Sequence, residues 1–192
     1  MDAVKAYRQR RYRRLLARLD GDNRFDYGVP GMKWGVRKER LTTSEERGLR
    51  QYKSFESYII NDMLRNIGYD NMPDEYKQMV DDIDAALEKL DSYKGEIFRV
   101  LQIDDEVALA KFLDEHKTGN TVRYPSYTSF SKRSGYNDDA NIYIRVPESR
   151  NGKDMDDCDN GEDEVLYGRD SSFVVESLDK SERGYTIVLS EV

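Results

Sequence analysis

Hydrophobic residues repeat at helical spacing along two segments that follow residue 40. The first segment runs from Ser44 to just before Gly68, and either Thr43 or Ser44 is expected to cap it. The second begins at Pro73, a residue suited to the first turn of a helix. The expected apolar stripes are Leu49, Tyr52, Phe55, Ile59, Met63 and Ile67 in the first helix and Tyr76, Val80, Ile83, Leu87 and Leu90 in the second. These stripes predict core packing and no chemistry.

After Gly95 the hydrophobic pattern changes to that of short strands. Residues 96–101 form a largely apolar run with one charged residue in its middle, Arg99. A helix over 105–116 is expected next, ending at His116, where a histidine more often interacts with the helix dipole than acts as a catalyst. Its expected inward residues are Val107, Leu109, Phe112 and Leu113. Further strands are predicted at 124–131, 141–146, 164–167, 172–176 and 185–189. Helices followed by short strands predict an α+β fold with mostly antiparallel pairing.

The first 43 residues have a different character and are predicted to form a separate segment, with the folded domain over 44–192. Residues 2–19 are rich in arginine, with a few apolar residues near one helical face. A solvated helix or a flexible tail is one interpretation of residues 2–19. Contact with nucleic acid through phosphate groups, anywhere in residues 1–40, is another, and binding to a membrane surface is a weaker third.

Residues 27–38 contain three glycines, a proline and the only tryptophan, Trp34, which excludes a regular element there. The string resembles a short Gly-Met-Lys-Trp-Gly signature that recurs in proteins of tailed bacteriophages, often near head-morphogenesis genes. That resemblance implies a phage origin and a possible contact with a capsid. It covers about a dozen residues and implies no mechanism.

Composition restricts the chemistry more than the fold. The chain of 192 residues has a net charge of −7, but residues 1–50 carry 14 basic and 7 acidic side chains, so the remainder is strongly acidic. A single cysteine, Cys158, and a single histidine, His116, exclude an internal disulfide, the usual zinc sets and nucleophiles that depend on histidine. No apolar run is long enough to span a membrane, and no signal peptide is predicted.

Three features of the strand-rich part could carry chemistry. They are the strand arginine Arg99, the Ser129-Phe130-Ser131 run, and the segment Glu162-Asp163-Glu164 that leads into a strand. Each has an ordinary interpretation on its own: an arginine at a strand edge, polar residues on a sheet face, and an acidic solvated turn.

In their order and spacing these features resemble the Arg-Ser-Glu family of ADP-ribosyltransferases, which includes arginine-modifying bacterial toxins, vertebrate ecto-enzymes and phage enzymes. The resemblance covers roughly residues 44–192. It implies an ADP-ribosyltransferase-like fold, with N-terminal helices followed by two packed, mainly antiparallel sheets around an NAD cleft. It also implies NAD as a substrate and no metal. Phe130 departs from the family, which has threonine there, and we expect its ring to pack inward.

The chemistry of ADP-ribose transfer suits these residue types. Breaking the nicotinamide–ribose bond develops oxocarbenium character on the ribose, which the Glu164 carboxylate could stabilise through the 2′-hydroxyl. Arg99 has the planar guanidinium that grips a pyrophosphate, and Ser129 could position the ribose or orient Glu164. Glu162 would lie on the same side of an extended chain as Glu164 and act on the acceptor. The expected contacts of NAD include Arg99, Ser129, Ser131, Tyr136 and Val100.

A glutamate at the position of Glu162 implies arginine as the acceptor. The preceding segment, residues 151–161, is acidic and glycine-bounded, as expected of a loop that recognises a basic target. A calcium loop is an alternative there, but the ligand spacing of an EF-hand is not met.

The sequence therefore predicts an NAD-dependent protein-arginine ADP-ribosyltransferase, a toxin-like enzyme that transfers a glycosyl group to a host protein and releases nicotinamide. One alternative is a structural or interaction protein of the phage head with an inactive domain. Another keeps the chemistry but uses nucleic acid or water as the acceptor. The expected location is the phage virion, the cytoplasm of the bacterial host, or both.

Overall fold

The computed structural model describes residues 40–134, 139–156 and 163–192. The predictions for the basic segment, for Trp34 and for the side chains of Tyr136, Cys158 and Glu162 fall outside the described residues. The boundary between residues 43 and 44 stays a prediction.

The first predicted helix is in fact two helices, α2 (Thr43–Tyr52) and α3 (Glu56–Asn66). The N-cap is Thr42, and not Thr43 or Ser44, because Thr42 and Glu45 form a reciprocal capping box. Helix α2 ends where Ser54 turns back on it, with both the backbone N–H and the hydroxyl of Ser54 donating to the carbonyl of Gln51.

The break between the two helices changes which residues of the second are buried. Phe55 is 51% exposed and Ile67 is also exposed, so both were wrongly predicted to belong to the core. Ile60 and Leu64 are buried instead. The break turns the second helix relative to the first, so a single repeat of 3.6 residues carried across both helices points to the wrong residues after the break.

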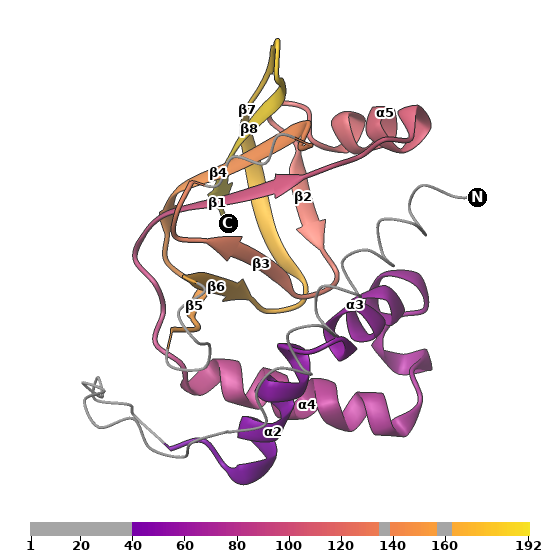
Figure 1. Cartoon of the computed structure of the whole chain (residues 1–192), viewed down its shortest axis with the longest axis vertical. Coiled ribbons are helices and arrows are strands. Elements are labelled where there is room, and N and C mark those ends of the chain that lie inside the picture. The colour runs from indigo at the N-terminus through magenta and orange to yellow at the C-terminus, as the bar shows by residue number, and fades with distance from the viewer. Residues whose placement is uncertain (1–39, 135–138, 157–162) are drawn as a thin grey trace. The chain divides into compact units, whose positions relative to one another are not determined.

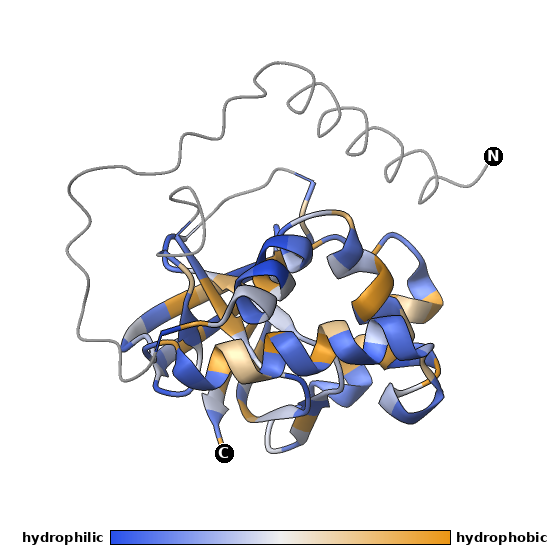
Figure 2. Ribbon diagram, turned by 90° about the horizontal axis from the view of Figure 1, so that it is seen from below, coloured by the Kyte–Doolittle hydropathy of each residue, from blue (hydrophilic) through white to orange (hydrophobic). Residues whose placement is uncertain are grey.

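Helix α4 (Asp74–Lys89) confirms the second predicted helix, and a short 3-10 turn, η1 (Tyr69–Asn71), precedes it. Figure 2 shows hydrophobic and hydrophilic residues alternating along these helices. Together they bury what we call the helical core, which also takes three residues from the strand-rich half. Its members are Leu49, Tyr52, Ile60, Leu64, Met72, Val80, Ile83, Ala86, Leu87, Leu90, Tyr127, Met155 and Leu166.

Eight strands form one hydrogen-bonded sheet in the order β2-β7-β8-β4-β1-β3-β6-β5. They are β1 (Gly95–Leu101), β2 (Thr121–Tyr124), β3 (Thr128–Ser131), β4 (Ile142–Ser149), β5 (Lys153–Asp154), β6 (Glu164–Tyr167), β7 (Ser171–Ser181) and β8 (Gly184–Glu191). Only β4 and β8 pair in parallel among these described strands. The α+β class with mainly antiparallel pairing is confirmed, and Figure 1 shows α2, α3 and α4 lying beside the end of the sheet that carries β3, β6 and β5.

The sheet differs from the expected pair of sheets because β1 and β3 remain joined, although only at Phe98 and Ser131. Phe98 and Ser131 are the one pair that joins β1 to β3 among the described residues. The predicted strand over 124–131 is likewise divided into β2 and β3. Pro125 lies between them and has no N–H to donate to a ladder.

The strands enclose a second buried cluster, the sheet core. It comprises Ile97, Val122, Phe130, Ile142, Ile144, Val146, Val165, Tyr167, Phe173, Val175, Ile187 and Leu189. Helix α5 (Glu106–Glu115) packs on it through Leu109, Phe112 and Leu113. Val107 was wrongly predicted to face inward and is 78% exposed, because residues two apart in a helix do not share a face.

His116 at the end of α5 is buried between Phe112 and Tyr124. Its Nδ1 donates to the Phe112 carbonyl at 2.8 Å, so in the neutral ring Nε2 accepts from the Tyr124 hydroxyl at 2.9 Å. Burial lowers the pKa of His116, which favours this neutral form. His116 thus bonds to a carbonyl of the last turn of α5, in line with its predicted interaction at the C-terminal end of that helix.

Candidate active site

Arg99, Ser129 and Glu164 come from β1, β3 and β6 and are linked by hydrogen bonds. Arg99 Nη1 donates to the backbone carbonyl of Ser129 at 2.5 Å. The Ser129 hydroxyl donates to Glu164 Oε1 at 2.5 Å. Three residues separated by up to 65 positions in the sequence thus meet at one place.

The register of β3 and β6 explains the contact between Ser129 and Glu164. Ser131 lies opposite Glu164, and Ser129 lies opposite Leu166, so Ser129 and Glu164 are diagonal neighbours on one face. The alternate residues point to the other face, where Phe130 is buried against the ring of Tyr167 at 5.3 Å between centroids. The inward packing predicted for Phe130 is confirmed.

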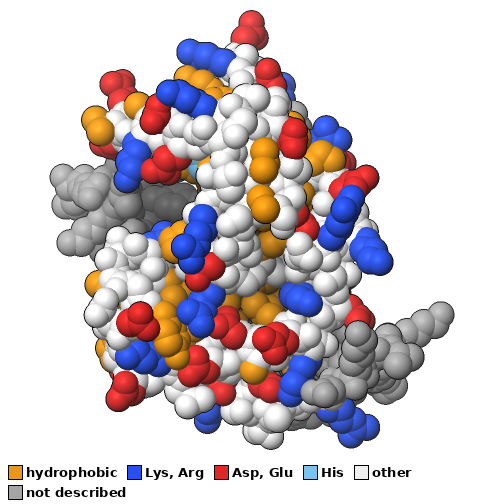
Figure 3. Space-filling model, turned by 180° about the vertical axis from the view of Figure 1, so that it is seen from behind, with side chains coloured by type: hydrophobic (Ala, Val, Ile, Leu, Met, Phe, Trp, Pro, Cys, Tyr) orange, Lys and Arg blue, Asp and Glu red, His pale blue; other side chains and the backbone are white. Residues whose placement is uncertain are grey.

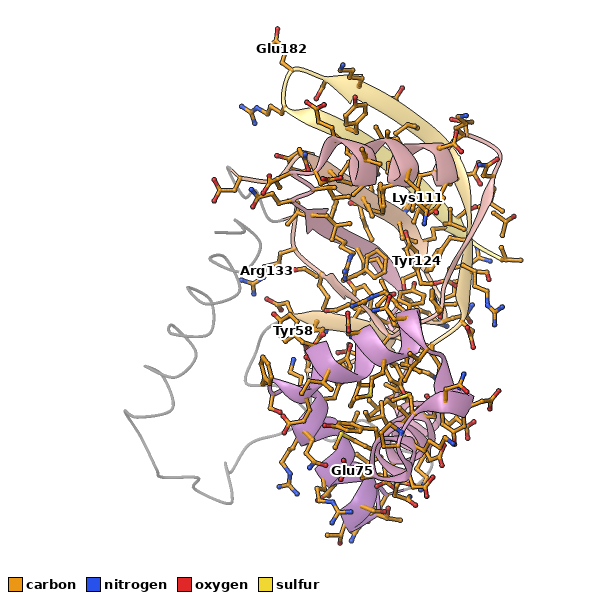
Figure 4. All side chains as sticks on the ribbon, turned by 90° about the vertical axis from the view of Figure 1, so that its right-hand side faces the viewer. Tyr58, Glu75, Lys111, Tyr124, Arg133 and Glu182 are labelled. Carbon is orange, nitrogen blue, oxygen red and sulfur yellow. The ribbon has the colours of Figure 1, made fainter. Side chains whose placement is uncertain are left out.

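Arg99 is half-buried, and among the described residues no carboxylate is bonded to its guanidinium. Burial lowers the pKa of this guanidinium, and the nearby charge of Arg65 acts in the same direction. The hydroxyls of Tyr52 and Tyr124 are close to it, and burial raises the pKa of each to about 12, so both stay neutral. Figure 4 shows Tyr124 near the level where the strands meet the helices.

Arg65 on α3 was missed by the sequence reasoning. Its Nη1 donates to the Ser126 hydroxyl at 3.2 Å, which ties α3 to the loop between β2 and β3. The site therefore holds two neighbouring guanidinium groups, Arg65 and Arg99, whose charges repel each other. An arginine near the end of an amphipathic helix gives no signal in the sequence that distinguishes it from a solvated one.

Lys53 was also missed. It lies at the C-terminal cap of α2, and its ammonium group forms an ion pair with Glu164 Oε2. The pair is poorly exposed, at 17% for the lysine side chain and 12% for the glutamate side chain. Both carboxylate oxygens of Glu164 therefore have a donor, Ser129 on one and Lys53 on the other.

Asp163 lies in the left-handed region of backbone conformation, with φ at 53°. Its carbonyl accepts from the backbone N–H of Lys132 at 2.8 Å, and its carboxylate pairs with Arg133 at 2.7 Å. We expected an extended backbone from Glu162 to Glu164. This prediction is wrong at Asp163, the residue between them. The alternation of an extended strand therefore does not place Glu162 and Glu164 on one side, and the role of Glu162 stays a prediction.

The remaining predicted contacts of NAD have different surroundings. Ser131 lies on the same face as Ser129 and accepts from the backbone N–H of Arg133 at 3.1 Å. Val100 follows Arg99 in β1, so its side chain lies on the opposite face of that strand. The Val100 side chain is therefore not brought together with the three linked residues. Tyr136 and Glu162 lie outside the described residues.

Within the described part of the chain, no three or more His, Cys, Asp and Glu side chains are grouped so that they could hold a metal ion. None of the described helices combines the length and the apolar character needed to cross a membrane.

The family model described as ADP-ribosyltransferase exoenzyme matches residues 31–191, which is most of the chain. The chain belongs to the ADP-ribosyltransferase exoenzyme family. No curated protein sequence matches it.

Solved structures share the fold of this exoenzyme-family chain at low sequence identity. An ADP-ribosyltransferase from Clostridium botulinum is 19% identical with a TM-score of 0.65, covering 79% of this chain and 87% of its own. The Vis toxin from Vibrio splendidus, in complex with agmatine, is 17% identical with a TM-score of 0.67, covering 82% and 78%. Exoenzyme S from Pseudomonas aeruginosa, solved with human 14-3-3 protein beta and carba-NAD, is 20% identical with a TM-score of 0.64, covering 79% and 74%.

These comparisons confirm the predicted ADP-ribosyltransferase fold and the toxin-like class of this exoenzyme-family member. The Arg-Ser-Glu subtype and the phage origin stay predictions.

Proposed function

We propose that this chain transfers one ADP-ribose from NAD to an arginine of a protein and releases nicotinamide. The observation that carries the proposal is the hydrogen-bonded series from Arg99 through Ser129 to Glu164. A carboxylate held by a serine beside a guanidinium provides the groups that the bond-breaking step needs.

Glu164 would stabilise the positive charge that develops on the ribose. As the bond to nicotinamide lengthens, the ribose 2′-hydroxyl becomes a stronger donor, and a carboxylate that accepts from it binds the transition state more tightly than the substrate. A carboxylate oxygen has two lone-pair sites. Glu164 therefore keeps acceptor capacity after Ser129 and Lys53 are bound.

Arg99 and Arg65 would hold the two phosphates of NAD. Their like charges lie near each other. Among the contacts of the described residues, no carboxylate is bonded to either guanidinium. A pyrophosphate bound here would neutralise both positive charges. Arg99 uses one donor on the Ser129 carbonyl and has others available. Ser131 would contact the dinucleotide from the same strand face as Ser129, Val100 through its backbone, and Tyr136 through its ring.

Arginine is the acceptor that we favour. The support is the Glu-x-Glu order of residues 162–164 and the agmatine complex of the similar Vis toxin, since agmatine carries a guanidinium group. On the face shown in Figure 3, acidic and basic side chains of the described residues are interspersed and form no continuous basic surface for phosphates. This favours a protein acceptor over nucleic acid. Action in the cytoplasm of a phage-infected host is part of the proposal.

The test is incubation of the purified chain with labelled NAD and a bacterial lysate. We expect protein labelling by the wild type and by Glu182→Ala, a glutamate at the tip of the β7–β8 hairpin (Figure 4), and none by Glu164→Ala. Equal labelling by Glu164→Ala would overturn the proposal. Release of nicotinamide without labelling would instead identify water as the acceptor.

The acceptor is tested separately by mass spectrometry of the labelled protein and by Glu162→Gln. We expect the label on arginine, and we expect Glu162→Gln to lose protein labelling while nicotinamide is still released, because Glu162 acts on the acceptor and not on the bond that breaks. Labelled nucleic acid would contradict the choice of acceptor.

A further inference from the structure

Lys53 reaches Glu164 from the break between α2 and α3. The lysine is the C-cap of α2, and its backbone N–H still donates to the Leu49 carbonyl at 3.0 Å, so the last turn of the helix fixes its position. Ser54 then ends the helix. The hydrophobic pattern did not reveal this break between α2 and α3. It is from this break that the Lys53 ammonium group reaches Glu164, the carboxylate proposed as catalytic.

The burial of Glu164 indicates what the Lys53 ammonium group does there. A carboxylate that is only 12% exposed has lost most of its hydration, and a buried charge is costly unless it is paired and hydrogen-bonded. Ser129 supplies one neutral donor on Oε1, and Lys53 supplies a charged donor on Oε2. With a fixed donor on each oxygen, the plane of the carboxylate cannot rotate freely.

We propose that Lys53 is a positioning residue for the reaction, holding Glu164 in the orientation that presents its free lone pairs to the ribose. This inference rests on the proposed function. Lys53 acts through Glu164 and not through NAD. Its loss should lower the rate of bond breaking and leave NAD binding almost unchanged, because the interaction between Glu164 and the ribose strengthens only as the transition state forms.

A second lysine–glutamate pair in the same layer provides a matched control. Lys89 at the end of α4 pairs with Glu45 in the first turn of α2 at 2.8 Å, with side-chain exposures of 22% and 9%. The hydrogen bond from Lys89 is the largest cause of the lowered pKa of Glu45. Chemistry and burial are thus similar to those of the Lys53 pair, but this pair connects two helices and contains no site residue.

The experiment measures nicotinamide release as a function of NAD concentration for the wild type, Lys53→Met, Lys53→Arg and Lys89→Met. We expect Lys53→Met to lower kcat about 10- to 100-fold, as for loss of one charged hydrogen bond, with KM within about twofold. Lys53→Arg keeps the charge and should retain most of kcat. Lys89→Met should keep wild-type kcat while its Tm falls by at least as much as that of Lys53→Met. If Lys53→Met does not fold, Lys53→Gln serves in its place.

A wild-type kcat in Lys53→Met, a change confined to KM, or an equal loss of kcat in Lys89→Met would overturn this inference. A thermal-unfolding cycle of Lys53→Met, Glu164→Gln and the double variant adds a readout that is independent of activity. We expect the two losses of Tm to be strongly non-additive, and additive losses would contradict the pairing itself. Absence of nicotinamide release by the wild type would overturn the proposed function as well, whereas an active wild type beside an unimpaired Lys53→Met would overturn this inference alone.

Discussion

The helical core and the sheet core are built in different ways. The helical core draws its members from three helices and takes Tyr127, Met155 and Leu166 from the strand-rich half. The sheet core is made by the strands, and α5 packs against it only through partly buried residues. Lys53, Arg99, Ser129 and Glu164 belong to neither cluster. The polar site thus lies outside both cores, so the residues that pack the fold and the residues proposed for chemistry form different sets.

Strand β6 contributes residues to both cores. Glu164 and Leu166 lie on the face towards the helices, and Val165 and Tyr167 lie on the face towards the sheet core. The same four-residue strand therefore holds the two cores together and carries the proposed catalytic carboxylate.

The largest effect should come from Glu164→Gln, which changes the site and neither core. We expect nicotinamide release to fall about 10³-fold, equivalent to about 4 kcal/mol of transition-state stabilisation. The Tm should move by only a few degrees, since no buried apolar contact is lost. Enzyme assays and thermal unfolding of the same preparation check this, with Glu182→Gln as a surface control. A collapse of Tm that matched the loss of activity would show that the site is part of the folding core.

A comparison of Leu166→Ala with Val165→Ala tests whether β6 joins the two cores. Each truncation removes a fully buried side chain, and we expect Leu166→Ala to cost about 2–5 kcal/mol of unfolding free energy and Val165→Ala somewhat less. Leu166→Ala should also reduce activity, because it loosens the face that carries Glu164. Urea unfolding and nicotinamide release measure the two effects. Equal losses of activity in the two variants would argue against any difference between the faces.

Tyr127→Phe tests a polar connection from the strand-rich half into the helical core. The Tyr127 hydroxyl donates to Asp84 Oδ1 at 2.6 Å and lies 3.1 Å from the Val80 carbonyl, and burial raises its pKa well above the ordinary value. We expect its removal to cost about 1–2 kcal/mol, since Asp84 keeps its partner Arg169. Tyr69→Phe, which loses an exposed bond to Asp81, should cost less. Equal losses in urea unfolding would remove the distinction between the buried and the exposed hydroxyl.

The smallest effect depends on pH and concerns α5. Because burial lowers the pKa of His116 in the folded state, the unfolded chain binds more protons below about pH 6.5, and stability is lost as the pH falls through that range. The loss is at most about 1.4 kcal/mol per pH unit. Thermal unfolding from pH 7.5 to 5.5 should show a smaller decrease for His116→Gln than for the wild type. Parallel decreases would mean that the pKa of His116 is the same in the folded and the unfolded chain.

The sequence was most informative where a single period governs a whole element. Helix α4 has a regular apolar stripe and was predicted with its core residues, and the strands around Arg99 and Glu164 were placed close to their observed bounds. The strand around Ser129 was predicted to begin four residues before it does. The meeting of these three residues follows from their ordered motifs, because each side chain is fixed by its position in a strand.

Other parts of the site depend on where helices end and pack, which periodicity does not encode. The position of Lys53 requires the helix to stop at Ser54, a local competition between side-chain and backbone hydrogen bonds. Arg65 approaches Arg99 only because α3 packs beside the β2–β3 loop. The joining of the sheet at Phe98 and Ser131 is likewise a tertiary event, since one residue pair leaves no pattern in the sequence.

The left-handed backbone of Asp163 restricts how the segment before Glu164 can diverge among descendants of this sequence. Glycine and asparagine adopt that conformation readily, and each can be reached from aspartate by a single-base change. Valine and alanine can also be reached by one base change, but neither fits, valine least of all because it is β-branched. In a library randomised at this codon and selected for activity, we expect aspartate, asparagine and glycine to survive, although only aspartate keeps the partner of Arg133.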